Sequence, residues 1–131
     1  MNRKRFTSIF LFTFVFLLFN GCGREPDKPN VDFTIDLNDP QYSTLYNLGG
    51  YVYINGIIVI RTVSGNYVAL SEYCTSDGSA LQYMVSQNEI VCPSDGSKFD
   101  TAGAVIFGPA QTPLIQYQTQ LIGSSLRIYT L

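Results

Sequence analysis

The sequence predicts a small all-β domain, an antiparallel β-sandwich or barrel, and three observations lead to this fold class. An Asn-Gly pair separates two apolar runs in the middle of the chain, which is typical of a β-hairpin with a two-residue turn. Apolar and polar residues alternate near the C-terminus, as they do along a strand with one buried face. No stretch of the globular part has a sustained apolar period of about 3.6 residues, so no amphipathic helix is expected.

Five strands are expected, in chain order, at 51–54, 57–63, 67–70, 115–121 and 126–130. The Asn-Gly pair at 55–56 joins the first two because these residue types accept the positive φ angles of a type I′ turn. Strings of Gly, Ser and Asn at 64–66 and 123–124 supply two further turns. Within 115–121 every second residue is glutamine, so the glutamines are expected on one face of that strand. In 126–130, Leu126 and Ile128 are expected to point inward.

Residues 1–21 are predicted to be the signal peptide of a bacterial lipoprotein. A basic start precedes the apolar run 6–19, whose fourteen residues are fewer than the roughly 20 that span a membrane. The Gly-Cys pair ending at Cys22 resembles a lipobox, in which the leader is cut before the cysteine and its thiol is acylated. The lipobox prefers Leu where this chain has Phe19. An ordinary secreted protein with an incidental cysteine and an uncleaved anchor are the alternatives.

A lipid on Cys22 would hold the protein at a membrane surface without a spanning helix. The expected location is therefore the cell envelope, on the exported side of a bacterial membrane. Residues 22–44 are rich in Pro and Asp and are interpreted as the acylated cysteine and its tether. The alternation within 31–37 also fits a first strand. The folded domain is expected at 45–131.

Composition excludes several classes of function. The chain has eight basic and ten acidic residues, and three of the basic ones lie in the leader. The remaining five basic residues, set against ten acidic ones, argue against a nucleic-acid partner. Histidine is absent, which excludes Ser-His-Asp and Cys-His catalysis and every metal site that needs imidazole. We therefore expect that the protein is not an enzyme.

Two boxes in the middle of the chain share a pattern. Residues 74–79 have the sequence Cys-Thr-Ser-Asp-Gly-Ser, and residues 92–97 have Cys-Pro-Ser-Asp-Gly-Ser. Together with Lys-Phe-Asp after the second box and Gly-Pro-Ala-Gln-Thr-Pro-Leu at 108–114, they resemble the Rieske iron–sulfur family over residues 45–131. The resemblance implies a Rieske-like fold with two inserted loops that form the cluster site. It also implies a covering segment over that site, with Gly108, Pro109 and Pro113.

The cluster ligands of the family are only half present. In the family each loop supplies one cysteine and one histidine, as Cys-x-His and then Cys-x-x-His. This chain keeps Cys74 and Cys92, but Ser76 and Asp95 occupy the histidine positions. A Rieske centre binds one iron through two thiolates and the other through two imidazoles. We therefore expect a vestigial cluster site with no cofactor. The alternative is a [2Fe-2S] cluster of unusual ligation that keeps the two cysteines as ligands.

The resemblance also bears on the state of the two cysteines. In the family both bind the same iron, which places their sulfurs roughly 3.7 Å apart. An exported protein lies in a compartment that permits disulfides. We therefore predict a disulfide between Cys74 and Cys92, with two buried free thiols as the alternative. Ser79 and Ser94 occupy the positions of a second, bridging cysteine pair that the cytochrome-complex subgroup of the family carries.

Three aspartates near the cysteines, Asp77, Asp95 and Asp100, raise the alternative of a Cys/Cys/Asp zinc site. Asp and Ser before Gly are also common turn residues that accept hydrogen bonds from their own backbone. Because the string Ser-Asp-Gly-Ser occurs in both boxes, we interpret it as two similar turns. No metal is expected.

Three functions remain open. The favoured one is a non-enzymatic envelope lipoprotein whose cluster-free domain is a structural or protein-binding module. The second is a Rieske-type electron carrier with unusual ligation, and the third is a thiol–disulfide redox protein that uses Cys74 and Cys92. Against the third, these cysteines lie on separate loops and form no Cys-x-x-Cys motif. The expected partners are a membrane, through the lipid, and an envelope or electron-transfer protein.

Overall fold

The computed structural model describes residues 28–131 of the 131-residue chain. The predicted signal peptide and Cys22 lie outside the described residues. The described part contains, in chain order, β1 (Asp32–Asp36), η1 (Pro40–Tyr46), β2 (Tyr51–Ile54), β3 (Ile57–Arg61), β4 (Tyr67–Ser71), β5 (Gln82–Met84), β6 (Glu89–Val91), β7 (Lys98–Phe99), β8 (Val105–Phe107), β9 (Gln116–Ile122) and β10 (Ser125–Tyr129). Every element except the short 3-10 helix η1 is a strand, which confirms the expected all-β class. Among these residues no helix has the length and apolar character to cross a bilayer.

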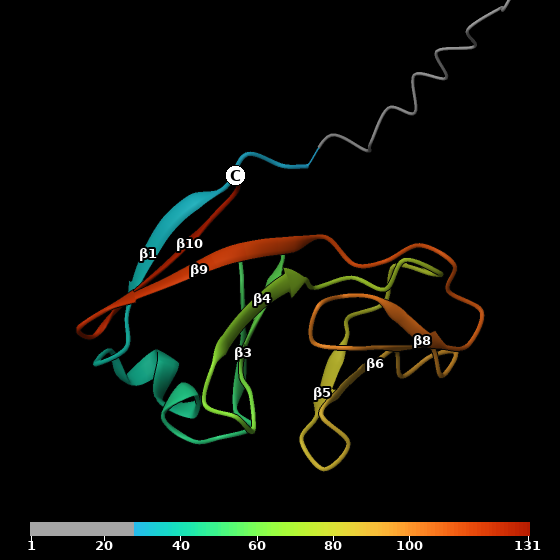
Figure 1. The fold of residues 1–131 in the computed structure, drawn as a ribbon, viewed down its shortest axis with the longest axis horizontal. Coiled ribbons are helices and arrows are strands. Elements are labelled where there is room, and N and C mark those ends of the chain that lie inside the picture. Colours follow the sequence, from blue (N-terminus) through green and yellow to red (C-terminus); the bar gives the residue numbers. More distant parts are fainter. Residues whose placement is uncertain (1–27) are drawn as a thin grey trace, which may run out of the picture.

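The strands form two antiparallel sheets. The first has six strands in the order β1-β10-β9-β4-β3-β2, and the second has four in the order β5-β6-β7-β8. The chain leaves the first sheet after β4, builds the whole second sheet and returns in β9. Figure 1 shows β5, β6 and β8 on the opposite side of the molecule from β1 and β10. Both cysteine boxes belong to this inserted half, because they lie between β4 and β5 and between β6 and β7.

The predicted hairpins are confirmed. Asn55 and Gly56 have φ angles of 53° and 77°, the positive values that a type I′ turn requires, and β2 pairs with β3 across them. Gly123, with a φ of 59°, lies in the turn between β9 and β10. The five strands expected from the sequence correspond to β2, β3, β4, β9 and β10.

The alternating segment 31–37 also forms a strand. β1 pairs antiparallel with β10 along its whole length, and Ile35 and Leu37 are buried. η1 follows and adds the buried Leu45 to the same core. The folded domain therefore begins at β1 rather than at the predicted boundary of residue 45, because the apolar face of the alternating segment is buried. Residues 32–44 belong to the fold and not to the tether.

The two faces of β9 differ in burial at its start. Gln116 is exposed and Tyr117 is buried, and these two residues pair with β4. Farther along, β9 pairs only with β10, and Leu121 is 49% exposed. The tip of the β9–β10 hairpin therefore extends beyond the neighbouring strand. In β10, Leu126 and Ile128 are fully buried, as expected.

Apolar side chains form two cores, and β3 contributes to both. One core contains side chains from both sheets and includes the cysteines of the two boxes. The other contains side chains from β1, η1 and β10. Because successive side chains of a strand point to opposite faces, Ile58 and Ile60 belong to the first core, whereas Ile57 and Val59 belong to the second. All four are at most 1% exposed.

Candidate functional site

The two boxes fold into two loops of the same backbone form. In the first loop the carbonyl of Cys74 accepts a hydrogen bond from the N–H of Gly78 at 2.9 Å, and the N–H of Cys74 donates to the carbonyl of Ser79 at 2.8 Å. The second loop repeats both bonds between its corresponding residues, at 3.0 and 2.8 Å. Gly78 and Gly96 have φ angles of 77° and 78°, which favours glycine at both positions. The prediction of two similar turns is confirmed.

The aspartates have the turn role expected of them. Asp77 Oδ1 accepts the backbone N–H of Ser79, and Asp95 Oδ1 accepts that of Ser97, each at 2.9 Å. Asp100 stabilises the next turn in the same way, since its Oδ1 accepts the backbone N–H groups two and four residues later. These bonds leave the second oxygen of Asp77 and of Asp95 free to make other contacts.

Those second oxygens join the two loops. Ser76 of the first loop donates a hydrogen bond to Asp95 Oδ2 of the second, and Ser94 of the second loop donates to Asp77 Oδ2 of the first. The hydroxyls of Ser79 and Ser94 also lie 2.8 Å apart. The residues at the two histidine positions therefore contact each other, and so do the two serines at the positions of the additional cysteine pair.

The two sulfurs lie between the core and this polar network. Cys74 is 3% exposed and Cys92 is 0% exposed. Cys74 Sγ lies 3.0 Å from the hydroxyl of Ser76, and Cys92 Sγ lies 3.2 Å from the hydroxyls of both Ser79 and Ser94. Both cysteines are free in this structure, so the predicted disulfide is not formed in it. A bond would require the sulfurs to approach to about 2.05 Å, and the disulfide stays a prediction for the oxidised protein.

The hydrogen bonds shift the pKa values of the two carboxyl groups. Bonds from Ser79 and Ser94 hold the pKa of Asp77 well below its usual range. The hydroxyl of Ser76 and the backbone of the loop lower the pKa of Asp95. Donors that bond to the charged form of a carboxyl group stabilise that form. Both aspartates are therefore anionic at neutral pH.

The two thiols have different environments. Burial raises the pKa of the Cys74 thiol, since it disfavours the charged thiolate. Burial acts in the same sense on Cys92, but hydrogen bonds from Ser79 and Ser94 outweigh it, and the pKa of Cys92 is lowered. Cys92 is therefore the thiol that loses its proton more readily.

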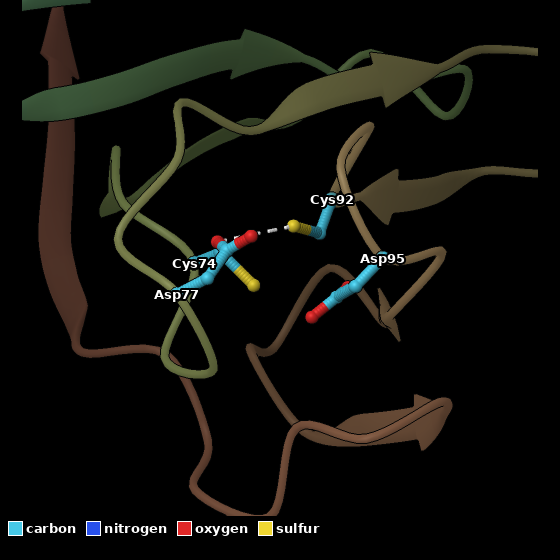
Figure 2. A group of neighbouring side chains, drawn as sticks. All are labelled: Cys74, Asp77, Cys92 and Asp95. Atoms are coloured by element: carbon cyan, nitrogen blue, oxygen red, sulfur yellow. Dashed lines mark hydrogen bonds between the residues drawn. The ribbon is translucent and has the colours of Figure 1, made fainter.

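Four potential metal ligands converge where the loops meet. One ligand atom from each of Cys74, Asp77, Cys92 and Asp95 lies within 4.8 Å of every other, and Figure 2 shows the four side chains pointing toward one another from the two loops. Asp77 was predicted to be a turn residue, and it was considered as a metal ligand only in the alternative of a Cys/Cys/Asp zinc site. The signal that identifies it is the Cys-x-x-Asp spacing, which occurs in both boxes.

The segment 108–114 contacts both loops, as the resemblance implied. The hydroxyl of Thr75 donates to the carbonyl of Thr112 at 2.6 Å. The N–H of Ala110 donates to the hydroxyl of Ser97 at 3.1 Å. One bond thus connects the covering segment to the first loop, and the other connects it to the second.

Gly108 makes the closest approach of this segment to the second loop. Its φ is 94°, and a Cβ atom at this position would lie 2.6 Å from the Cα atom of Ser97. Only glycine allows this contact. Pro109 and Pro113, the other two residues predicted for the segment, are exposed on it.

Comparisons with known proteins agree with this architecture. Residues 33–118 match the family model described as the Rieske [2Fe-2S] domain. The cytochrome b6-f complex iron-sulfur subunit of Chlorobaculum thiosulfatiphilum is 31% identical over 71 residues, which cover 54% of this chain and 39% of that protein. The subunit of the same name from Synechococcus elongatus is 32% identical over 65 residues, which cover 50% of this chain and 36% of that protein. The chain thus spans less than half the length of these curated relatives.

Two solved structures share the fold. The plasma membrane Rieske protein PetC3 of Synechocystis PCC 6803 superposes with a TM-score of 0.55 at 24% identity, over 79% of this chain and 100% of that one. The ferredoxin of carbazole 1,9a-dioxygenase from Nocardioides aromaticivorans IC177 gives a TM-score of 0.55 at 21% identity, over 63% of this chain and 86% of that one.

Proposed function

The chain belongs to the Rieske [2Fe-2S] domain family, and from this premise we propose that it is a lipid-anchored envelope protein whose Rieske domain holds no [2Fe-2S] cluster. The domain then serves as a structural or protein-binding module rather than as an electron carrier or an enzyme. The observation that carries this proposal is the hydrogen bond between Ser76 and Asp95, the residues at the two histidine positions.

The residues at the site do not fit a Rieske cluster. Such a cluster needs two imidazoles on one of its irons, and the chain contains no histidine. Ser76 would have to bind as an alkoxide, which forms with difficulty at neutral pH, and Asp95 would replace a neutral donor with an anion. In the structure these two side chains are hydrogen-bonded to each other. No electron-transfer step follows from this donor set.

The hydrogen bonds between the two loops support a structural role, in which they take the place of the cluster. Where the family loops are held together by iron and by a disulfide, the corresponding side chains of this chain form hydrogen bonds between the loops. Exposed apolar residues on the edge strand β8, Ile106 and Phe107 at 50% and 64% exposure, support protein binding nearby, since such residues in edge strands favour contact with another chain.

Anchoring at Cys22 would place the domain close to the membrane. Residues 23–31 separate the acylation site from β1, and a fully extended segment of that length reaches about 30 Å. The domain would then remain within about one protein diameter of the lipid surface on the exported side. This arrangement suits a module that acts on envelope partners in the same membrane.

Anaerobic reconstitution with iron and sulfide tests the absence of a cluster. The full chain should retain neither stoichiometric iron and sulfide nor a Rieske-type electron paramagnetic resonance signal. The double variant Ser76→His/Asp95→His restores the family ligands and should gain both, which shows that the procedure loads a competent site. Stoichiometric iron and sulfide in the unchanged protein would overturn the proposal.

That outcome would favour the second candidate, an electron carrier with unusual ligation. It is supported by the relation to iron-sulfur subunits of cytochrome b6-f complexes. Its cluster would have to be held by Cys74 and Cys92 together with oxygen donors. We therefore expect its reduction potential to lie below that of a centre with two imidazole ligands.

A further inference from the structure

The donor set Cys74, Asp77, Cys92 and Asp95 differs from the ligand set of the family, since Asp77 is not at a ligand position. We infer that these four residues, with both cysteines reduced, bind a single Zn²⁺ ion where the two loops meet, and that the two thiols release their protons to solvent and bind as thiolates. This goes beyond the proposed function, because a mononuclear ion needs neither imidazole nor sulfide.

The spacing of the four donors is that of a structural zinc site. Such sites take two ligands from each of two short turns, commonly separated by two residues within each turn. Both loops of this chain repeat one pattern, Cys-x-x-Asp-Gly, with the glycine at positive φ. Each loop thus presents one sulfur and one carboxylate, and the two loops together supply the four ligands of a tetrahedral site.

The distances are close to those of an ion-bound geometry. Zinc–sulfur bonds of about 2.3 Å and zinc–oxygen bonds of about 2.0 Å place tetrahedral ligand atoms roughly 3.3–3.8 Å apart. Cys92 Sγ and Asp77 Oδ1 already lie 3.6 Å apart, and all four ligand atoms lie within 4.8 Å of one another. Figure 2 shows Cys74 and Asp77 facing Cys92 and Asp95 across the space between the loops. Movements of about 1 Å would therefore complete the site.

The negative charge of the donor groups also favours the binding of a cation. Two carboxylates lie next to two ionisable thiols, and within residues 28–131 the salt bridges are elsewhere, between Lys98 and Glu89 and between Arg127 and Asp32. No basic side chain neutralises the four donors in the described part of the chain. Two thiolates and two carboxylates around one divalent ion give the ion the charge compensation and the soft sulfur ligands that favour Zn²⁺ over Mg²⁺ or Ca²⁺.

The surrounding serines have the position of outer residues that orient metal ligands. Ser94 and Ser79 hydrogen-bond to Asp77, and Ser76 hydrogen-bonds to Asp95. Hydrogen bonds of this kind fix the orientation of metal-bound carboxylates and tune metal affinity. In this arrangement Ser76 acts through Asp95 and Cys74 and does not touch the ion.

Titration of the metal-free full chain with Co²⁺ and then Zn²⁺ tests the site. The protein is purified in detergent with a reductant and stripped with a chelator. Co²⁺ should produce the thiolate-to-cobalt charge-transfer absorption and the intense visible bands of a tetrahedral site, at one ion per chain, and Zn²⁺ should abolish both. A chain with a Cys74–Cys92 disulfide should give no such spectrum, because both thiolates are lost.

Two neighbouring variants distinguish this ligand set from that of the family. Asp77→Asn keeps an acceptor for the turn and should raise the dissociation constant for Zn²⁺ by about 100-fold or more, since it removes a ligand. Ser76→Ala removes only outer hydrogen bonds, to Asp95 and Cys74, and should raise it by about tenfold. The unchanged protein needs no variant to show the cobalt spectrum, so impaired folding of a variant does not hide the result.

The proposal is overturned by a cobalt spectrum without thiolate bands, by binding of more than one ion per chain at the cysteines, or by a larger effect of Ser76→Ala than of Asp77→Asn. Iron with equimolar sulfide would instead count against the proposed absence of a cluster. The two proposals can thus fail separately.

Discussion

The two cysteine loops differ in sequence at one position, Thr75 against Pro93, and yet their last serines have different roles. Ser79 takes part in the polar network and hydrogen-bonds to Asp77. Ser97 is fully buried and accepts the N–H of Ala110 from the covering segment. The shared sequence determines the backbone turn, whereas the neighbouring segment determines the role of the side chain.

The two thiols also differ, both in their contacts with serine hydroxyls and in the direction of their pKa shifts. Each cysteine contacts the serine two residues later, Cys74 with Ser76 and Cys92 with Ser94. Ser79 of the first loop also reaches across to Cys92, and no such contact from the second loop reaches Cys74 among the described hydrogen bonds. Burial therefore determines the pKa of Cys74, which is raised, while the additional donor helps to lower the pKa of Cys92.

The largest effect is expected where the covering segment meets the second loop. Gly108→Ala should destabilise the protein by about 4 kcal/mol, because the new Cβ would be placed against the backbone of Ser97 at positive φ. Gly78→Ala and Gly96→Ala are matched controls with open space around the added atom, and each should cost about 1 kcal/mol. Urea unfolding measures all three, and similar losses would show that the covering segment does not distinguish the loops.

A covalent link between the loops should have the next largest effect. The predicted disulfide between Cys74 and Cys92, which lie 18 residues apart, should stabilise the oxidised protein by about 3 kcal/mol relative to the reduced protein. Urea unfolding with and without reductant measures the difference, and it should disappear in the variant Cys74→Ser. Alkylation of both thiols in the denatured, unreduced mature protein, detected by mass spectrometry, would show that the bond does not form.

Removing the hydroxyl of the last serine of each loop, Ser79 or Ser97, should lower the stability of the protein by different amounts. Ser97→Ala leaves the N–H of Ala110 buried without a partner and should cost about 1–2 kcal/mol in urea unfolding. Ser79→Ala should cost less, about 0.5 kcal/mol, since its hydrogen bonds to Asp77 and Ser94 are exposed and only its contact with Cys92 is partly buried. It should instead raise the pKa of Cys92, measured by the ultraviolet absorbance of the thiolate. Equal losses of stability would remove the proposed difference between the loops.

The smallest effect concerns the stability of the protein in acid, to which one carboxyl group of each loop contributes. The folded-state pKa values of Asp77 and Asp95 are lowered, so their contribution to stability is present above the unfolded value of about 3.9 and is lost as the pH falls below it. The double variant Asp77→Asn/Asp95→Asn should unfold with a weaker dependence on pH between about 5 and 2, a change in the acid midpoint of less than about one pH unit. An unchanged acid transition would contradict this role.

The sequence predicted those parts of the fold that depend on neighbouring residues. The Asn-Gly turn at 55–56 and the alternation of β9 and β10 are local signals, and they predicted the hairpins. The strands β5 to β8 are two or three residues long, too short to show a period. The family resemblance implied two inserted loops in this region but not these strands. The boundary at residue 45 was wrong because the burial of β1 depends on β10, a partner at the other end of the chain.

The candidate site likewise combines features that follow from neighbouring residues with features that depend on residues far apart in the sequence. The turn roles of Asp77 and Asp95 follow from the residue before each glycine and are confirmed. The bonds from Ser76 to Asp95 and from Ser94 to Asp77 connect residues 19 and 17 positions apart. They depend on how the second sheet folds back against the first loop. No local pattern contains that information.

Strand β3 gives the molecule one further property, which concerns cooperativity. Its alternate side chains are divided between the two cores. The inserted half and the terminal strands therefore pack on opposite faces of the same strand. Shortening Ile58 would open a void in the first core, and shortening Val59 would open one in the second. The two halves are therefore expected to lose their structure together, in a single two-state transition, even though one is held by a regular sheet and the other ends in polar loops.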